Sequence, residues 1–113
     1  MSKIPAGWFP RRGEVYLLGL DKDRPAVIIS NDVLNHHALD VCVVPITSVH
    51  RGRFALRVAL RAGEGGLNRD SWAKCDQVTT LDKQSIVFPA LGRLSTATLR
   101  NIEEGVRIAL DIK

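Results

Sequence analysis

The sequence lacks the features of membrane, secreted and zinc-binding proteins. Its longest apolar stretches, such as residues 25–29 and 41–46, are far shorter than the roughly 20 residues of a membrane-spanning helix. The first residues contain no apolar signal-peptide core. The two cysteines, Cys42 and Cys75, form no zinc-site spacing with histidine. We therefore expect a cytoplasmic protein with no metal or other cofactor and with two free, buried thiols.

The composition is that of one ordinary soluble domain with an excess of positive charge. The chain has 113 residues, of which 45% are hydrophobic and 25% are charged, and no linker or internal repeat divides it. The net charge is +4, and 11 of the 16 basic residues are arginine. Arginine enrichment favours recognition of phosphate or carboxylate. A basic face would suit a nucleic acid or an acidic protein equally well, and a solvated surface would carry the same charge.

Two short apolar runs that end in polar turns are the most informative feature that is present. They cover residues 24–32 and 41–48, and each predicts a buried strand. If the two strands pair, Arg24 and Thr47 meet at one rim of a sheet. The arginine offers a rigid fork of donors and the threonine adds a hydroxyl, which suits the binding of a phosphate. The alternatives are structural roles: Arg24 would pair with Asp21 or Asp23, and the Thr47 hydroxyl would complete a turn.

Several other short strands are expected between turn residues. The predicted strands are 14–20, 25–30, 41–46, 54–61, 71–75, 77–80 and 86–88, the last ended by Pro89. Between them, residues 31–40 form a loop with one helical turn capped by Asn31 or Asp32. The clearest alternation is at 54–61, where the even positions are apolar and the odd positions include Arg57 and Arg61. It predicts an apolar inner face and a basic outer face.

The end of the chain predicts a helix that begins after Ser95 as its N-cap. An apolar stripe at helical spacing marks its buried face: Leu99, Ile102, Val106, Ala109 and Leu110. Glu103 and Arg107 are expected to pair on the opposite face. Gly105 costs roughly 1 kcal/mol in a helix relative to alanine, so it marks a close contact. Many short strands with one terminal helix indicate a mainly β fold, a small, strongly bent barrel or sheet capped by that helix.

Two segments carry weaker signals. Residues 1–10 are expected to form a loose arm because Pro5, Gly7 and Pro10 oppose regular structure, with Trp8 and Phe9 folded back onto the body. Residues 62–66 are rich in glycine, but no Gly-Lys-Ser/Thr follows them, so they indicate a flexible loop rather than a phosphate-binding loop.

Five motifs in order resemble the MazF/PemK toxins from about residue 11 to the end of the chain. The motifs are Arg12-Gly13-Glu14-Val15-Tyr16, Arg24-Pro25 running into Ile29-Ser30-Asn31-Asp32, Val44-Pro45-Ile46-Thr47-Ser48, Cys75-Asp76-Gln77 with Asp82-Lys83 downstream, and Leu91-Gly92-Arg93-Leu94-Ser95. The resemblance implies an SH3-like barrel, usually homodimeric. It also implies a metal-independent endoribonuclease that cuts single-stranded RNA at short sequences, and an antitoxin whose acidic tail occupies the RNA groove.

The resemblance also assigns roles to residues. It implies Arg24 and Thr47 as the functional pair, with Asp76 as a further catalytic residue and Lys74 as a basic contact. From the residues themselves, Gln77 could read a base edge, Ser48 lies beside the pair, and Arg51 and Arg53 could line an RNA path. The same positions also fit turn or solvent-exposed roles. Asp76 would act as a base, orient Arg24, or bond local amides in a turn.

Two departures from the family pattern bear on selectivity. The first loop is only Asp21-Lys22-Asp23, and Thr79 stands where many members have arginine. A non-catalytic relative that binds RNA or an antitoxin is therefore an alternative. A gyrase poison related to CcdB is a further one, although the chain ends without the tryptophan that those proteins use.

Cleavage of RNA without a metal requires three tasks. The 2′-hydroxyl loses a proton, the leaving 5′-oxygen gains one, and the charge on phosphorus is stabilised. Arg24 suits the third task but not the first, because a guanidinium with a pKa above about 12 is almost never neutral at pH 7. His50, three residues after Thr47, carries the natural acid–base group, although an exposed loop histidine is the simpler reading.

Overall fold

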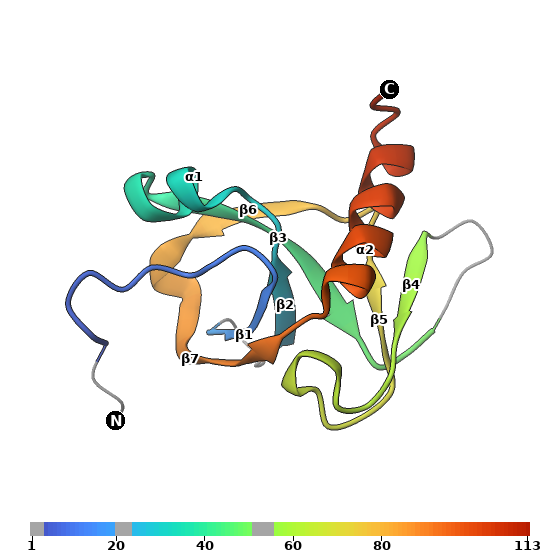
Figure 1. Cartoon of the computed structure of the whole chain (residues 1–113), viewed down its shortest axis with the longest axis horizontal. Coiled ribbons are helices and arrows are strands. Elements are labelled where there is room, and N and C mark those ends of the chain that lie inside the picture. The colour runs from blue at the N-terminus through green and yellow to red at the C-terminus, as the bar shows by residue number, and fades with distance from the viewer. Residues whose placement is uncertain (1–3, 20–23, 51–55) are drawn as a thin grey trace.

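The computed structural model describes residues 4–19, 24–50 and 56–113 (Figure 1). In this part of the chain seven strands form one bent sheet: β1 (Glu14–Leu18), β2 (Arg24–Ile28), β3 (Asp40–Thr47), β4 (Arg57–Leu60), β5 (Ser71–Lys74), β6 (Thr79–Asp82) and β7 (Ile86–Arg93). The helices are α1 (Asp32–His37) and α2 (Thr96–Ala109), with 3₁₀ turns η1 (Glu64–Gly66) and η2 (Lys83–Ser85). The expected mainly β fold with a C-terminal helix is confirmed.

Strand β3 is the centre of the sheet because it pairs with three other strands. Its first half pairs with β6, its middle with β2, and its last residues with β5, all antiparallel. The strand order β4-β5-β3-β2-β1-β7 leaves β4 and β7 at opposite ends, so the sheet curls without closing. This path places the start of β2 and the end of β3 side by side.

Both faces of the curled sheet are covered. On one face, Val27, Val44 and Ile46 pack with Ile102 of α2, which stands across the sheet in Figure 1. On the other face, Tyr16 and Ile28 belong to a second apolar cluster. These two clusters explain the continuous apolar run in β2 and β3: neighbouring residues point to opposite faces, and both faces are buried.

The last residues of the N-terminal segment pack against the body of the protein. Pro10 is fully buried, and the Trp8 ring lies edge-on to Tyr16 and Phe88, with centroid distances of 5.9 and 5.5 Å. Phe9 stacks on His36 at 4.4 Å. The expectation that Trp8 and Phe9 fold back is confirmed, and aromatic packing holds these two residues against the body.

The predicted helices are confirmed with their caps. Asn31 caps α1 by accepting the Leu34 N–H at 2.9 Å, and Ser95 caps α2 by accepting the Thr98 N–H at 3.2 Å. The close contact at Gly105 is also confirmed, since an added Cβ there would lie 2.8 Å from the Cys75 sulfur. None of the helices in the described ranges is long and apolar enough to cross a membrane.

Two strand predictions were wrong at their ends. Strand β7 does not stop at Pro89 but continues to Arg93. The ladder between β7 and β1 is interrupted at a register shift between Val15 and Leu17, and Pro89 lies opposite this interruption. A proline is tolerated there because no ladder hydrogen bond requires its missing N–H. Strand β6 begins at Thr79 rather than at Gln77, because Gln77 is in a turn, where its N–H donates to the Lys74 carbonyl at 3.0 Å.

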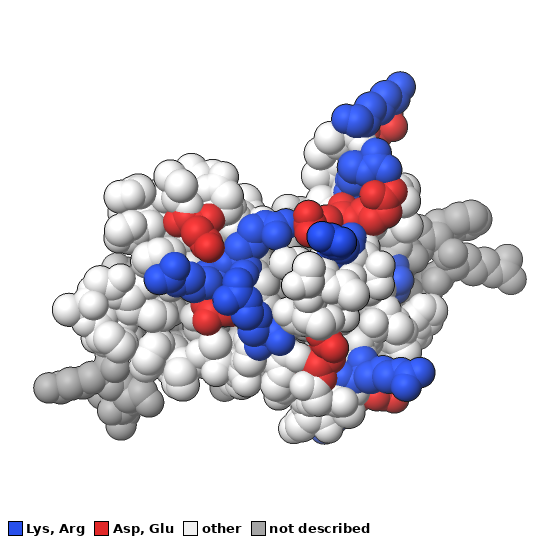
Figure 2. Space-filling model, viewed as in Figure 1, with Lys and Arg blue, Asp and Glu red and all other residues white. Residues whose placement is uncertain are grey.

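Two charge predictions were also wrong. Arg107 bonds Glu104 rather than Glu103, and Glu103 instead pairs with Arg12 from the N-terminal segment at 3.2 Å. In Figure 2, acidic and basic side chains accordingly lie side by side along α2. The outer face of β4 is not uniformly basic and exposed, because the Arg57 side chain is only 11% exposed and pairs with Asp76. The part of the predicted alternation at 54–55 lies outside the described residues.

The cysteines agree with the sequence expectation of free thiols. Cys75 is buried just after β5, while Cys42 in β3 is only partly buried and lies 3.4 Å from the Thr80 hydroxyl. Burial raises the pKa of the Cys75 thiol above its usual value.

Candidate functional site

The register of the sheet brings Arg24 and Thr47 together. Strands β2 and β3 pair Ala26 with Pro45 and Val27 with Val44, so the same register continued to the strand ends sets Arg24 opposite Thr47. Arg24 is the first residue of β2 and Thr47 the last of β3. Because side chains of directly opposed residues share a face, both project from the same side of the sheet. Both residues line one cavity at this rim.

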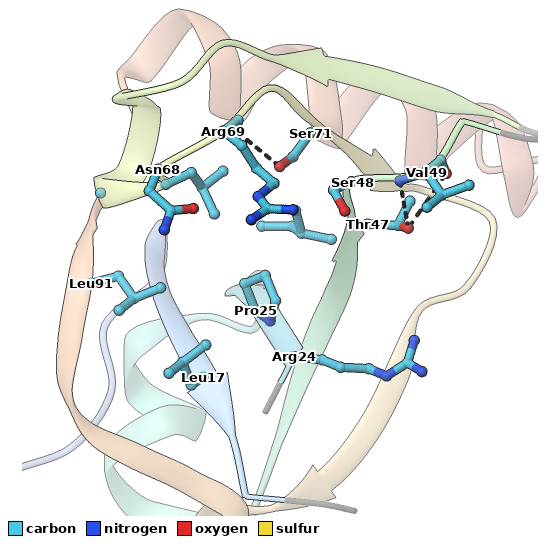
Figure 3. A pocket seen from close by; sticks show the side chains of 13 residues that line it. Leu17, Arg24, Pro25, Thr47, Ser48, Val49, Asn68, Arg69, Ser71 and Leu91 are labelled. Carbon is cyan, nitrogen blue, oxygen red and sulfur yellow. Dashed lines mark hydrogen bonds between the residues drawn. The ribbon is translucent and has the colours of Figure 1, made fainter. Parts of the chain in front are cut away.

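A cavity of about 520 Å³ lies at this rim (Figure 3). Its apolar part includes Leu17, Pro25 and Leu91. Its polar part is formed by Arg24, Thr47, Ser48, Asn68, Arg69 and Ser71. Among the described lining residues there are two arginines and no carboxylate. An apolar floor with a cationic, hydroxyl-bearing wall suits a ligand that has both a flat apolar part and a negative charge.

The cavity residues differ in where they point. Figure 3 shows the Arg69 guanidinium in the middle of the cavity, whereas Arg24 extends away from the apolar floor on the side where Thr47 lies. The Thr47 hydroxyl accepts the Val49 N–H at 3.1 Å and donates to the Val49 carbonyl at 3.4 Å. The Arg69 carbonyl accepts the Ser71 hydroxyl at 3.0 Å, which fixes the loop before β5.

Asn68 and Arg69 were missed by the sequence analysis. Both belong to the polar run that leads into β5. The signal that the sequence offered for them was an arginine directly before an acidic residue at the start of a strand. Asp70 accepts the Ala62 N–H at 2.9 Å and so closes the loop that begins after β4. That closure, a contact over eight residues, brings Arg69 over the end of β2 and could not be read from the local sequence.

The face that carries Arg24 and Thr47 continues across the sheet. Thr47 is opposite Trp72 of β5, and Lys74, two residues further along β5, is opposite Arg57 of β4. Trp72 and Lys74 therefore project from the same face as Thr47. Lys74 is partly buried there and is not among the residues that line the cavity.

Asp76 lies in the turn after β5 and is bound by Arg57. The distance from Arg57 Nη1 to Asp76 Oδ1 is 2.5 Å, and the same Nη1 lies 3.4 Å from the Leu56 carbonyl. The arginine that the Asp76 carboxylate holds in this structure is therefore Arg57. Gln77 is exposed in the same turn and, like Asp76, is outside the cavity lining.

The remaining predicted residues divide into two groups. Ser48 is exposed, lines the cavity and points into it in Figure 3. Arg51, Arg53 and the loop at 21–23 lie outside the described residues. Thr79, which departs from the family pattern, begins β6 and donates its hydroxyl to the Gln77 carbonyl at 3.0 Å.

Comparison with known proteins agrees with this fold. Residues 11–110 match the model of the PemK-like, MazF-like toxins of type II toxin–antitoxin systems. The chain belongs to this family. The matched residues include Arg24, Thr47 and the whole of β1–β7.

Named relatives cover almost the whole chain. Endoribonuclease MazF9 of Mycobacterium tuberculosis is 32% identical over 90% of this chain and 97% of its own length. Endoribonuclease MazF of Staphylococcus saprophyticus is 30% identical over 90% of this chain and 92% of its own length. A solved structure of a mycobacterial endoribonuclease in complex with its cognate antitoxin superimposes with a TM-score of 0.80, at 30% identity, covering 92% of this chain and 97% of that one.

Proposed function

We propose that this chain is the toxin of a type II toxin–antitoxin pair and an endoribonuclease that cuts single-stranded RNA at selected sequences without a metal ion. The products carry a 2′,3′-cyclic phosphate or a 3′-phosphate, and a 5′-hydroxyl. Family membership and two relatives named endoribonucleases support this function. The structural observation that carries it is the register of β2 and β3, which sets Arg24 opposite Thr47 beside a cationic cavity.

Arg24 and Thr47 stabilise the charge that develops on phosphorus. A guanidinium donates two parallel hydrogen bonds to non-bridging oxygens and stays charged throughout the reaction. The Thr47 hydroxyl donates only a long hydrogen bond, 3.4 Å, to the Val49 carbonyl, and it exchanges this bond for one to a phosphate oxygen when RNA binds. Donors fixed in place before the reaction act without reorganisation, which is why they lower the barrier.

The other cationic and polar groups bind the RNA on either side of the cut. Ser48 and Arg69 supply contacts in the cavity, and Lys74 supplies a phosphate contact on the same face of the sheet. Gln77 reads a base edge from the turn after β5. Arg51 and Arg53 extend the path as further phosphate contacts.

The same surface fits the protein partners of the family. An acidic, extended antitoxin segment would compete with RNA for Arg24 and Arg69, since the described cavity lining offers positive charge and no carboxylate. A homodimer is the working assembly that the family resemblance favours. Addition of a cognate antitoxin should therefore suppress cleavage in proportion to the toxin bound.

The test is incubation of the pure protein with a long single-stranded RNA in EDTA, followed by primer extension to map the ends. We expect discrete cuts with 5′-hydroxyl ends. Arg24→Ala should remove them while leaving the circular dichroism spectrum unchanged. Arg100→Ala is the matched control, because Arg100 is an exposed arginine on α2, away from the cavity.

Three results would contradict the proposal in different ways. Intact RNA across several substrates would contradict ribonuclease activity and favour a binding module. Cleavage that disappears in EDTA would contradict the metal-independent reaction. Full cleavage by Arg24→Ala would contradict the assignment of this site while leaving the activity in place.

A further inference from the structure

We infer that His50 is the base that removes the proton from the 2′-hydroxyl, and that Trp72 is the positioning residue that holds its imidazole at the reaction site. This inference rests on the proposed ribonuclease function and adds the proton acceptor that Arg24 and Thr47 do not provide.

His50 is brought to the site by the turn that follows β3. The Val49 N–H donates to the Thr47 hydroxyl at 3.1 Å, so the chain folds back immediately after the strand. The His50 ring then lies with its centroid 5.2 Å from that of Trp72, at an interplanar angle of 59°. Trp72 is directly opposite Thr47 in the β3–β5 ladder. The contact with Trp72 therefore places the exposed imidazole against the residue of β5 that is opposite Thr47.

The other candidates that the sequence offered for a proton acceptor are less suitable. A guanidinium is a poor proton acceptor by its chemistry, which disfavours Arg24. Asp76 is held by Arg57 at 2.5 Å, so using it as a base would break an ion pair whose arginine is nearly buried. His36 and His37 lie on α1, where the His36 ring stacks on Phe9 and contacts the His37 ring. Helix α1 precedes β3, and Thr47 is at the far end of that eight-residue strand.

Imidazole has the chemistry that this task requires. It takes up and releases protons between about pH 5 and 8, so a large fraction is neutral and able to accept a proton at physiological pH. The charged groups on the same face are Arg24 of β2, Lys74 of β5 and Arg57 of β4, the last neutralised by Asp76. These cations attract the phosphate, while the imidazole is left to handle the proton.

The proton and bond changes balance in one transesterification and one recovery step. The 2′-oxygen forms a bond to phosphorus as its proton passes to the neutral His50 ring, and the bond between phosphorus and the 5′-oxygen breaks. The leaving 5′-oxygen takes a proton from water. The hydroxide that remains takes the proton from the imidazolium, which restores the neutral ring. No oxidant, metal or second substrate is consumed.

The decisive variant is His50→Phe, which keeps an aromatic ring against Trp72 but cannot accept a proton. Under single-turnover conditions we expect the cleavage rate constant to fall by about a hundredfold or more, while the Kd for a 2′-deoxy, uncleavable RNA analogue changes less than about threefold. His37→Phe is the matched control, because it makes the same exchange at an exposed histidine on α1. It should retain the wild-type rate.

The pH profile provides the readout that a structural role would not move. The wild-type rate constant should rise with pH through one ionisation and then level off, since the neutral imidazole is the active form. The profile of His50→Phe should lack that ionisation. The profile of Trp72→Leu should keep the ionisation but show a lower rate constant.

The outcomes separate this inference from the proposed function. If the wild-type protein leaves all RNA intact, the proposed function fails first. If the wild-type cuts and His50→Phe cuts equally fast with the same pH profile, the proton acceptor is elsewhere and the inference is overturned. If His50→Phe loses only affinity for the analogue, His50 is a base-stacking residue and the inference is likewise overturned.

Discussion

Arg57 and Asp76 form an ion pair that joins strand β4 to the turn after β5. Its nitrogen–oxygen distance is 2.5 Å, and the exposed fractions of the two side chains are 11% and 37%. The Arg57 Nε is buried and has no hydrogen-bond partner among the described residues. The guanidinium therefore depends on Asp76 for the compensation of its charge.

This dependence predicts that Asp76→Ala destabilises the fold. Removal of the carboxylate leaves a nearly buried cation unpaired, so the free energy of unfolding in urea should fall by about 2 kcal/mol, a value reduced from that of a fully buried pair because Asp76 is partly exposed. The double variant Arg57→Met with Asp76→Ala should regain most of the loss. If Asp76→Ala instead kept its stability but lost all cleavage, Asp76 would act in the reaction itself.

Arg69 lies in the cavity, and its replacement should weaken RNA binding without changing which bases are preferred. A contact with a phosphate contributes to affinity through the release of counterions, so loss of one contact lowers the slope of log K against log salt by about 0.7 for single strands. We expect this smaller slope for Arg69→Ala when RNA binding is followed by fluorescence anisotropy from roughly 50 to 300 mM salt. Arg61→Ala, an exposed arginine outside the cavity lining, is the control. Equal slopes for both variants and the wild type would place Arg69 outside the RNA path.

Gly105 allows α2 to pack directly on Cys75. An alanine Cβ at this position would lie 2.8 Å from the Cys75 Sγ and 3.0 Å from its Cβ. The clash outweighs the gain in helix propensity of about 1 kcal/mol, so Gly105→Ala should lower the stability by about 1–2 kcal/mol. The double variant Gly105→Ala with Cys75→Ala should be more stable than the sum of the two single changes. Strict additivity in thermal melts would contradict the contact.

Asp32 predicts a loss of stability in acid. The Arg12 backbone N–H donates to its carboxylate at 2.7 Å and lowers the pKa of Asp32 below its ordinary value. Since the pKa is lower in the folded state, the stabilisation is present above the unfolded pKa of about 4 and is lost as the pH falls through the folded pKa. Urea titrations between about pH 6 and 2.5 should show a smaller decline for Asp32→Asn than for the wild type. Parallel curves would show that the carboxylate is not linked to folding.

The sequence by itself determined the local structure and the chemical inventory. The apolar run that begins at Arg24 and the run that ends at Thr47 fix two buried strands because both faces of each are apolar, and Ser95 fixes the start of α2 through its side-chain cap. Order and spacing of the short motifs were enough to indicate the family, because each motif lies at a strand end or turn where few residue types fit.

Only the tertiary structure decided which charges meet. The ladder register sets Arg24 against Thr47 and Trp72 beside both, whereas the pairing of Arg57 with Asp76 depends on side-chain contacts between residues 19 apart. A strand pattern indicates which side chains share a face, but not which partner a long side chain reaches or whether an arginine is exposed. The placement of Arg69 at the cavity likewise depends on the contact by which Asp70 closes its loop onto Ala62. Local propensity does not encode this contact across eight residues.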